Sequence, residues 1–419
     1  MPAIGFRRGL WVVLAVALAL RLGAIAAAGD VAPVVDALDF DRHAVAIAEA
    51  GDYPASAVLP WQTETAFRPP GLPLTLAAVY EVVGTGDEDT RWLAGRILLA
   101  LLGTVAVALA ALVARRVWGD TVALVTGMLC ALHPVLVMVG ISLMSEALYI
   151  PLVLGAVLVA LRPEGRWPAA AAGALVGLAA LTRSNGLVLV LPLAWLVWTG
   201  RPRRSWKALQ RPLLLIAAVV LVLAPWTMRN AIVLDAFVPI STQGGFALAG
   251  TFNEQARDDP RFPALWRPAD RVPALAAAYT DPSRSEPEVS SELRAAALDY
   301  ASEHPGYVLE VVARGALRLV NLEGPAIERF LAPYEGYPVR LAVGSVYAFW
   351  LLALLAAAGA AAARARSAPR ALWWVPLLMA ASAVLFGLTR YRSPADPFLA
   401  MLAACALVTA AERSLASRR

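Results

Sequence analysis

The chain has 419 residues, of which 59% are hydrophobic and 16% are charged. A soluble domain averages roughly 45–50% apolar residues, so this composition predicts several membrane spans and excludes an ordinary soluble domain. The formal net charge is +5, but the arginines stand in short blocks between apolar runs. That pattern indicates membrane topology and argues against nucleic-acid binding.

The cysteines and histidines give no sign of a metal site. Cys130 and Cys405 both lie inside apolar runs, without a disulfide framework or the spacing of metal ligands. The histidines His43, His133 and His304 are scattered along the chain, and no HExxH motif is present. A zinc enzyme is therefore not expected.

Ten apolar segments predict the membrane-spanning helices. They lie near 10–28, 92–114, 120–141, 146–162, 168–182, 185–199, 212–228, 341–363, 371–388 and 395–411. The first resembles a signal peptide, since Arg7 and Arg8 precede it and "AIAAAGD" ends it. Arg21 interrupts its apolar run and more spans follow, so we expect an uncleaved anchor.

The arginine blocks predict the orientation of these spans. Blocks lie at 7–8, 115–116, 162–166, 201–207, 364–370 and 413–419. Every second connection carries one of them, as the positive-inside rule requires for ten spans with both termini in the cytoplasm. We therefore expect a multi-pass protein of the inner or plasma membrane.

The opposite face then receives two long polar segments, 29–91 and 229–340. Each contains an amphipathic stretch, at 71–84 and 307–321, which we interpret as a helix lying in the membrane interface. As a helix the first would be only ~21 Å long, short of the ~30 Å hydrocarbon core. This gives three regions: a catalytic membrane module with the first external loop, an external region with an amphipathic helix, and C-terminal membrane helices. Their bounds are 1–228 with the loop 29–91, 229–340 and 341–419.

Charged residues gather at the outer ends of the predicted spans. The acidic ones are Asp36, Asp39, Asp41 and Glu146; the basic ones are Arg68, Arg183, Arg229, Arg390 and Arg392. A single interfacial arginine is explained equally well by snorkelling to the membrane surface. Five on the face that the positive-inside rule disfavours indicate a bound anion, and arginine binds phosphate through charge-assisted, often bidentate hydrogen bonds. An aspartate beside a phosphate leaving group suits a general base for an attacking hydroxyl.

Several short motifs together resemble a known enzyme family. The stretch "DALDFDRHA" followed by "RPPGLPL" resembles the first external loop of the GT-C glycosyltransferases, in the branch of the protein O-mannosyltransferases and the aminoarabinose transferase of lipid A. The similarity continues through "HPVLVMVGISLMSEAL", "GLAALTRSNG", "APWTMRNAIVLDAFVPISTQGG" and "RYRSPADPFLAMLAA". It thus follows nearly the whole chain in order. The fold it implies is an all-α membrane bundle of about ten transmembrane helices with interfacial helices and irregular external loops.

The resemblance also implies an activity and a set of site residues. It implies transfer of a sugar from a polyprenyl-phosphate donor on the outer side of the membrane, with Asp36 at the position of the catalytic aspartate. Ala37 and Phe40 replace a frequent Ser and Tyr of that motif, so Asp39 stays open as the base. Arg68 matches a residue that grips the donor phosphate, and Glu146 one that helps to hold a divalent metal or the acceptor. No Asp-Glu pair stands in the first loop, so the metal remains an open question.

Our interpretation is a membrane glycosyltransferase of the cell envelope, acting by a single inverting displacement. Asp36 or Asp39 takes the proton of the acceptor hydroxyl, while Arg68, Arg183, Arg229, Arg390 and Arg392 bind the donor phosphate. The expected partners are a polyprenyl-phosphate-linked sugar, the lipid bilayer, and a glycan, lipid or protein acceptor, with no nucleic acid. The alternative is a transporter or flippase of lipid-linked sugars, but transporters bind substrate near the bilayer midplane between repeated halves, and this chain shows no repeat.

Overall fold

The computed structural model describes residues 5–29, 31–56, 59, 64–162, 165–198, 206–268, 271–273, 275–276, 281 and 284–418. These residues form helices and connecting turns and contain no strand, so the predicted all-α class is confirmed. The helices are, in chain order, α1 (Phe6–Ala28), α2 (Asp36–Ala50), α3 (Gly71–Val83), α4 (Glu88–Trp118), α5 (Asp120–Leu132), α6 (Pro134–Met138), α7 (Glu146–Ala160), α8 (Trp167–Thr182), the 3₁₀ helix η1 (Ser184–Leu189), α9 (Val190–Trp198), α10 (Trp206–Val233), α11 (Gln243–Thr251), α12 (Glu254–Arg257), α14 (Glu286–Glu303), α15 (Pro305–Leu319), α16 (Pro325–Glu335), α17 (Val339–Ala361), the 3₁₀ helix η3 (Ala363–Ser367), α18 (Arg370–Ala383), α19 (Thr389–Arg392) and α20 (Asp396–Ala416).

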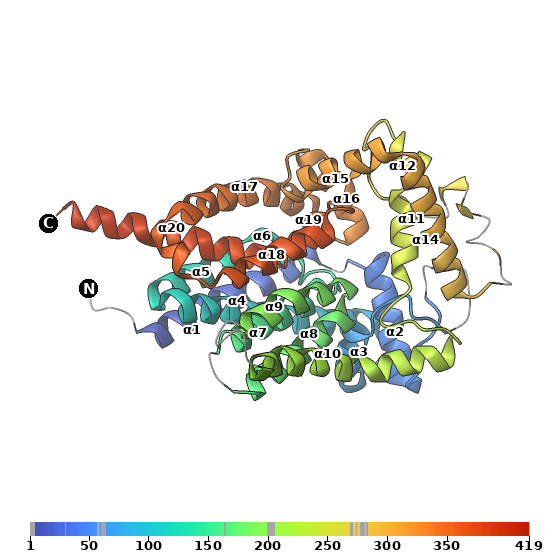
Figure 1. Cartoon of the computed structure of the whole chain (residues 1–419), viewed down its shortest axis with the longest axis horizontal. Coiled ribbons are helices and arrows are strands. Elements are labelled where there is room, and N and C mark those ends of the chain that lie inside the picture. Colours follow the sequence, from blue (N-terminus) through green and yellow to red (C-terminus); the bar gives the residue numbers. More distant parts are fainter. Residues whose placement is uncertain are drawn as a thin grey trace.

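Each of the ten predicted apolar segments coincides with a helix or a broken pair of helices. Within the described residues, five helices are long and apolar enough to cross a membrane: α1, α4, α10, α17 and α20. The others are shorter, and one is broken because Pro134, which has no N–H to donate, starts α6 directly after α5. In Figure 1 the long helices lie roughly parallel and form the body of the molecule.

Close approach of helix backbones holds the bundle together where glycine replaces larger residues. A Cβ added at Gly173 of α8 would lie 2.1 Å from the carbonyl oxygen of Leu215 in α10, and one at Gly177 would meet Val222. Small residues at this spacing allow two membrane helices to pack backbone against backbone. Helices α8 and α10 therefore pack backbone against backbone at these glycines.

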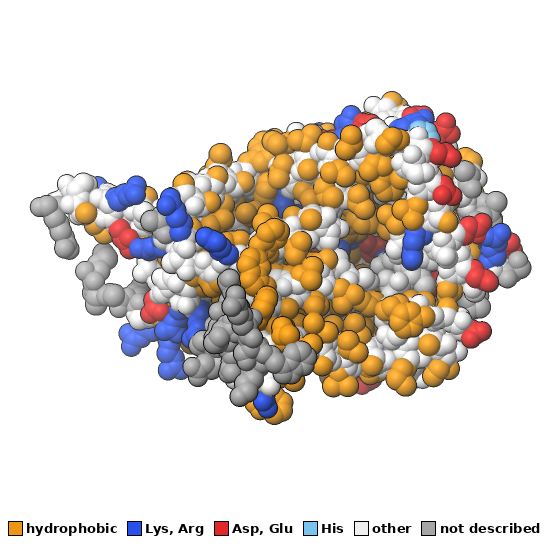
Figure 2. All heavy atoms as spheres, in the orientation of Figure 1, with side chains coloured by type: hydrophobic (Ala, Val, Ile, Leu, Met, Phe, Trp, Pro, Cys, Tyr) orange, Lys and Arg blue, Asp and Glu red, His pale blue; other side chains and the backbone are white. Residues whose placement is uncertain are grey.

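Several arginine blocks meet at one end of the bundle, while residues 201–205 of another block lie outside the described residues. Arg115, in the last turn of α4, lies over the ring of Phe6 at the start of α1. The indole of Trp118 donates to the carbonyl of Arg364, and Arg364 pairs with Glu412 near the end of α20. Figure 2 shows arginine side chains gathered at this end, a broad hydrophobic band, and mixed acidic and basic side chains at the other end.

The opposite end carries helices α2, α11, α12 and α14, called the external helices here because they lie outside the bundle of long helices (Figure 1). Helices α11 and α14 pack so closely that a Cβ at Gly245 would lie 1.9 Å from the carbonyl of Ser290. Around this contact a separate hydrophobic core includes Phe67, Phe246 and Val289. Because Phe67 belongs to this core, the external helices fix the backbone next to Arg68.

The two stretches predicted as interfacial helices form α3 and α15. Helix α15 buries Tyr307, Val311 and Gly315 against the protein, while Leu309 on another face is 73% exposed. An apolar face left open on a helix outside the main bundle is typical of an interfacial helix. The position of α3 and α15 relative to the bilayer stays a prediction.

Candidate active site

The first turn of α2 presents two aspartates on one face. Asp36 starts the helix after Val35, whose φ of 45° turns the chain sharply into α2. Carboxylates are favoured in the first turn of a helix because the N-terminal end of the helix dipole is positive. Asp36 and Asp39 are three residues apart, a spacing that lets both side chains reach a common partner.

That common partner is Arg68. Its Nη2 donates to Oδ1 of Asp36 at 2.8 Å, and its Nε donates to Oδ2 of Asp39 at 2.7 Å. The guanidinium also stacks over the rings of Phe40 and Phe67. Ser56 supplies a second hydrogen bond to Asp39. Arg68 is therefore held in place from both sides by the aspartates of the opening motif.

A second arginine reaches Asp36 from the far end of the chain. Nη2 of Arg390 in α19 donates to Oδ2 of Asp36 at 2.7 Å, so one carboxylate lies between two guanidiniums. Among the described residues, Nη1 of Arg390 bonds only the thioether sulfur of Met144, and its Nε lies 3.1 Å from Oε1 of Glu335 without a hydrogen bond. Since sulfur is a weak acceptor, Arg390 keeps two N–H groups available for a stronger one.

The two arginines control the charge of Asp36. Burial by itself raises the pKa of this carboxyl, but the fields of Arg68 and Arg390 and their hydrogen bonds outweigh burial and bring the pKa well below its ordinary value. Asp36 is therefore ionised at every working pH. Its side chain keeps 21% of its surface exposed, whereas that of Asp39 is fully buried.

Tyr391 connects this centre to Arg183 and Glu146. The Arg183 guanidinium lies 4.5 Å from the centre of the Tyr391 ring, and that of Arg390 lies 4.8 Å from it. Nη1 of Arg183 donates to Oε1 of Glu146 at 2.6 Å and to Ser145. Glu146 starts α7 and is fully buried, and its Oε2 has no hydrogen-bond partner. Asp36, Asp39, Arg68 and Arg390 are called the array below, and the structure thus brings Glu146 to its edge.

Tyr53 connects the centre to Arg229 on the other side. The Tyr53 hydroxyl donates to the carbonyl of Arg68, and Arg229 stacks on the Tyr53 and Trp226 rings. Nη1 of Arg229 donates to the carbonyl of Thr65 at 2.7 Å. No ion pair is found for Arg229 among the described residues. Its charge is thus not neutralised by a contacting carboxylate there.

The structure does not bring Arg392 to this array. Its Nε donates to Asp396 at 3.0 Å, its Nη1 bonds the carbonyl of Leu319, and its guanidinium stacks on Phe349. Asp396 also contacts His133 at 3.0 Å. These contacts tie α19 to the core of the bundle, which is a structural task.

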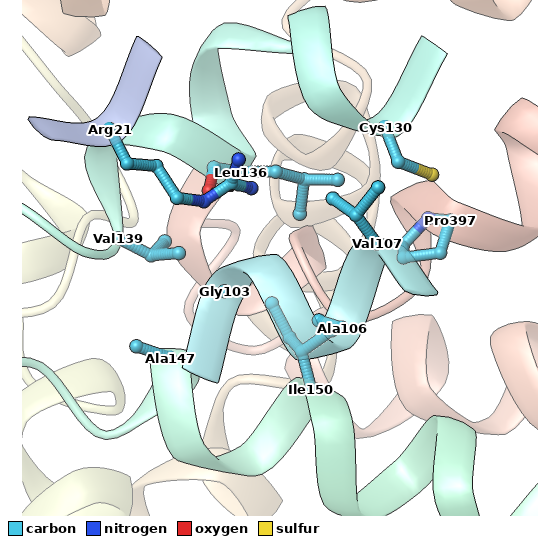
Figure 3. A pocket seen from close by; sticks show the side chains of 10 residues that line it. All are labelled: Arg21, Gly103, Ala106, Val107, Cys130, Leu136, Val139, Ala147, Ile150 and Pro397. Carbon is cyan, nitrogen blue, oxygen red and sulfur yellow. Dashed lines mark hydrogen bonds between the residues drawn. The ribbon is translucent and has the colours of Figure 1, made fainter. Parts of the chain in front are cut away.

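Arg21, the charge inside the first span, also turns inward. Its guanidinium donates to the carbonyls of Ala17 and Leu136, each at 3.0 Å, and contacts Gly103. Figure 3 shows it beside a small apolar cavity that Cys130 also lines. Arg21 thus connects α1 to α6, next to the break between α5 and α6, and does not contact Asp36 or Asp39.

Sequence reasoning missed three residues that hold or border the site: Tyr53, Glu286 and Glu335. Tyr53 follows the aspartates closely, but nothing in the sequence indicates that it touches Arg68. Glu286 and Glu335 lie in the long external segment, where no periodic pattern exposes a role. Glu335 lies 3.1 Å from Nε of Arg390.

Glu286 clamps the loop that carries Arg68. Buried at the start of α14, it accepts hydrogen bonds from the Thr65 hydroxyl, from the Ala66 amide at 3.1 Å and from the Thr242 hydroxyl at 2.6 Å. Burial raises its pKa, and the three donors only partly oppose that rise. The external helices are thus connected to Arg68 through one carboxylate.

Glu286→Ala is therefore expected to destabilise the protein by about 3 kcal/mol, since it leaves buried donors without an acceptor at about 1–3 kcal/mol each. Thermal unfolding of the purified protein measures the loss. Glu303→Ala, an exposed acid at the other end of α14, is the control and should be nearly neutral. Equal melting temperatures for the two variants would show that the clamp is unimportant.

The site does not fit a resident divalent metal. Among the described residues, no group of three His, Cys, Asp or Glu side chains is placed to hold an ion. Each acid here already lies beside a guanidinium: Asp36 beside Arg68 and Arg390, Glu146 beside Arg183, and Glu335 beside Arg390. A cation placed there would be repelled by three guanidiniums.

Comparison with known proteins identifies the fold. Residues 67–228 match the family model of dolichyl-phosphate-mannose-protein mannosyltransferases. The archaeal oligosaccharyltransferase AglB from Archaeoglobus fulgidus, in complex with an inhibitory peptide and a dolichol-phosphate, superposes with a TM-score of 0.59 at 14% identity, over 99% of this chain and 51% of that one. The chain thus spans about half the length of that enzyme.

A further structure is less similar overall. ArnT from Cupriavidus metallidurans, bound to undecaprenyl phosphate, gives a TM-score of 0.44 at 19% identity, over 95% of this chain and 77% of that one. No curated protein matches the chain. The family model and the AglB superposition confirm the resemblance seen in the sequence and the GT-C fold.

Proposed function

We propose that the chain is a membrane glycosyltransferase that moves a sugar from a polyprenyl-phosphate donor to an acceptor hydroxyl. The observation that carries this proposal is the Asp36 carboxylate held between Arg68 and Arg390, two arginines that the chain brings together from opposite ends. A carboxylate that two guanidiniums bind occupies the kind of place that a phosphate takes. The dolichol-phosphate in the AglB complex supports the same chemistry.

The proposed reaction is a single inverting displacement. The acceptor oxygen forms a bond to the anomeric carbon while the bond from that carbon to the phosphate oxygen breaks and its electron pair stays on the phosphate. The hydroxyl proton passes to Asp36, which later releases it to water. Arg390, with Nε and Nη1 still poorly satisfied, receives the growing negative charge on the phosphate. Electrostatic stabilisation of this kind supplies most of the rate enhancement in many enzymes.

Because its pKa is low, Asp36 can act as a base only after an arginine has moved from it to the donor phosphate. A carboxylate that two guanidiniums stabilise is a weak base. When the donor phosphate draws Arg390 toward itself, Asp36 loses one stabilising charge, and its pKa rises toward a value useful for proton transfer. Donor binding thus activates the base. The partial exposure of Asp36 favours it over the fully buried Asp39, whose task is to hold Arg68.

The other charged residues take supporting roles in the proposal. Arg183 and Arg229 flank the centre through Tyr391 and Tyr53 and add positive charge along the path of the phosphate. We assign Glu146 to the acceptor side, because its Oε2 has no hydrogen-bond partner among the described residues.

Transport is the less favoured function. The array of Asp36 and Arg390 lies at the end of the bundle beside external helices, whereas transporters bind near the midplane. A transfer assay with the purified protein separates the two: a glycosyltransferase releases free polyprenyl phosphate from a synthetic polyprenyl-phosphate sugar, while a flippase leaves the donor intact.

The proposal places the site outside the cell and both termini in the cytoplasm. Cysteines introduced at the exposed positions Asp52 and Arg116 test this orientation with a membrane-impermeant thiol reagent. We expect labelling at Asp52 and none at Arg116 in intact cells. Background is low because Cys130 and Cys405 are both buried. Labelling at Arg116 alone would reverse the orientation.

A further inference from the structure

Glu335 is a second carboxylate beside Arg390: it lies next to Nε, whereas Asp36 is bonded to Nη2. It ends α16 and is buried, and its Oε1 is 3.1 Å from Nε of Arg390 without forming a hydrogen bond. Gly336 follows at φ +70°, and a Cβ there would be 3.1 Å from the Ser142 hydroxyl. This tight turn keeps the Glu335 carboxylate beside Arg390.

The charges around Arg390 balance only when Glu335 is neutral. Arg68 and Arg390 carry two positive charges, and Asp36 and Asp39 carry two negative ones. An ionised Glu335 adds a third negative charge at the place where the proposed donor brings its phosphate. Two like-charged groups beside one guanidinium then compete for it.

We propose that Glu335 is a positioning residue that competes with Asp36 and the donor phosphate for Arg390, so that the charge of Glu335 sets how well Arg390 serves the reaction. This inference rests on the proposed function. With Glu335 neutral, Arg390 directs its donors to Asp36 and the phosphate. With Glu335 ionised, Nε of Arg390 pairs with it and the donor is repelled.

The surroundings of Glu335 place its ionisation above neutral pH. Burial raises its pKa to about 8, against the lowering effect of Arg390 and with further rises from Glu328, Glu146 and Asp36. Glu328 lies on α16 with Glu335, while Arg390 lies on α19, Glu146 on α7 and Asp36 on α2. The buried Tyr337 hydroxyl is a further titratable group near Glu335. Glu335 is therefore neutral at pH 7 and loses its proton as the pH rises through about 8.

The test compares pH profiles of kcat/KM for a synthetic polyprenyl-phosphate sugar. Wild type should lose activity above pH 8, by about tenfold per pH unit, because only the form with neutral Glu335 is active. In Glu335→Gln this alkaline loss should disappear. Glu328→Gln is the control: that acid is also buried but bonds Thr389, so its variant should keep the loss. An unchanged alkaline loss in Glu335→Gln overturns the inference.

A second measurement does not depend on transfer. The infrared band of a protonated carboxyl should be present at pH 7, vanish as the pH rises through about 8, and be missing in Glu335→Gln. Its absence at pH 7 in the wild type also overturns the inference. If Glu335→Gln fails to fold, Glu335→Met tests the same prediction without a charge. No transfer by wild type at any pH defeats the proposed function, whereas active wild type with the same alkaline loss in the variant defeats only this inference.

Discussion

Asp36→Asn is expected to lower kcat by about 10²–10⁴-fold, the usual contribution of a general base. Asparagine keeps the shape of the side chain and accepts a hydrogen bond from one arginine, but it takes no proton. Donor binding should persist, since Arg68 and Arg390 remain and lose a competing carboxylate. Single-turnover transfer together with binding of undecaprenyl phosphate separates these two effects.

Asp39→Asn is the matched control for Asp36. The side chain of Asp39 is fully buried and holds Nε of Arg68, so its loss leaves a buried charge with a weaker partner. Removing one partner of a buried pair typically costs about 3–5 kcal/mol of stability, and the milder change to asparagine should cost less. Asp39→Asn should thus lower the melting temperature while transfer by the folded protein survives. The reverse pattern, with Asp36→Asn active and Asp39→Asn inactive but folded, would move the base to Asp39.

The second large effect concerns Arg390. Arg390→Lys should lower kcat/KM for the lipid donor by about 10²–10³-fold, the cost of removing one preorganised donor to a developing charge. Lysine keeps the charge but loses the planar fork that can bond two phosphate oxygens. Part of the loss should fall on kcat, because the phosphate gains charge as the glycosidic bond breaks.

Arg392→Lys offers a control two residues away on the same short helix. Arg392 bonds Asp396 and Leu319, so its change should reduce stability and leave the donor KM of the folded protein nearly unchanged. An arginine that merely reaches the membrane surface would tolerate lysine, since both side chains snorkel. Unchanged kinetics in Arg390→Lys would therefore remove Arg390 from the reaction.

Much of this arrangement is readable from the sequence because it follows from strong local signals. Apolar runs predict the helices, and arginine blocks predict the end of the bundle at which they meet. Asp36 and Arg68 stand in motifs that place them in the first external loop. Their contact in the structure agrees with that expectation, while their roles stay proposals.

The remaining residues depend on tertiary packing, which no spacing rule exposes. Arg390 and Arg392 look equivalent in the sequence, yet residues two apart on a helix point to different sides, and only Arg390 reaches Asp36. Glu335 and Arg390 stand on different helices, α16 and α19, and meet only in the folded structure. Arg21 only interrupts an apolar run in the sequence, whereas in the structure two backbone carbonyls inside the bundle accept its hydrogen bonds.

Release of polyprenyl phosphate by the purified protein tests the central claim most directly. A set of synthetic undecaprenyl-phosphate sugars, each with a labelled hexose or pentose, is incubated with the protein and with membranes from a strain that lacks it. We predict that wild type transfers one of these labels to the membranes and releases undecaprenyl phosphate, and that Asp36→Asn does so at least about a hundredfold more slowly. Transfer that proceeds equally well in wild type and in Asp36→Asn would contradict the account.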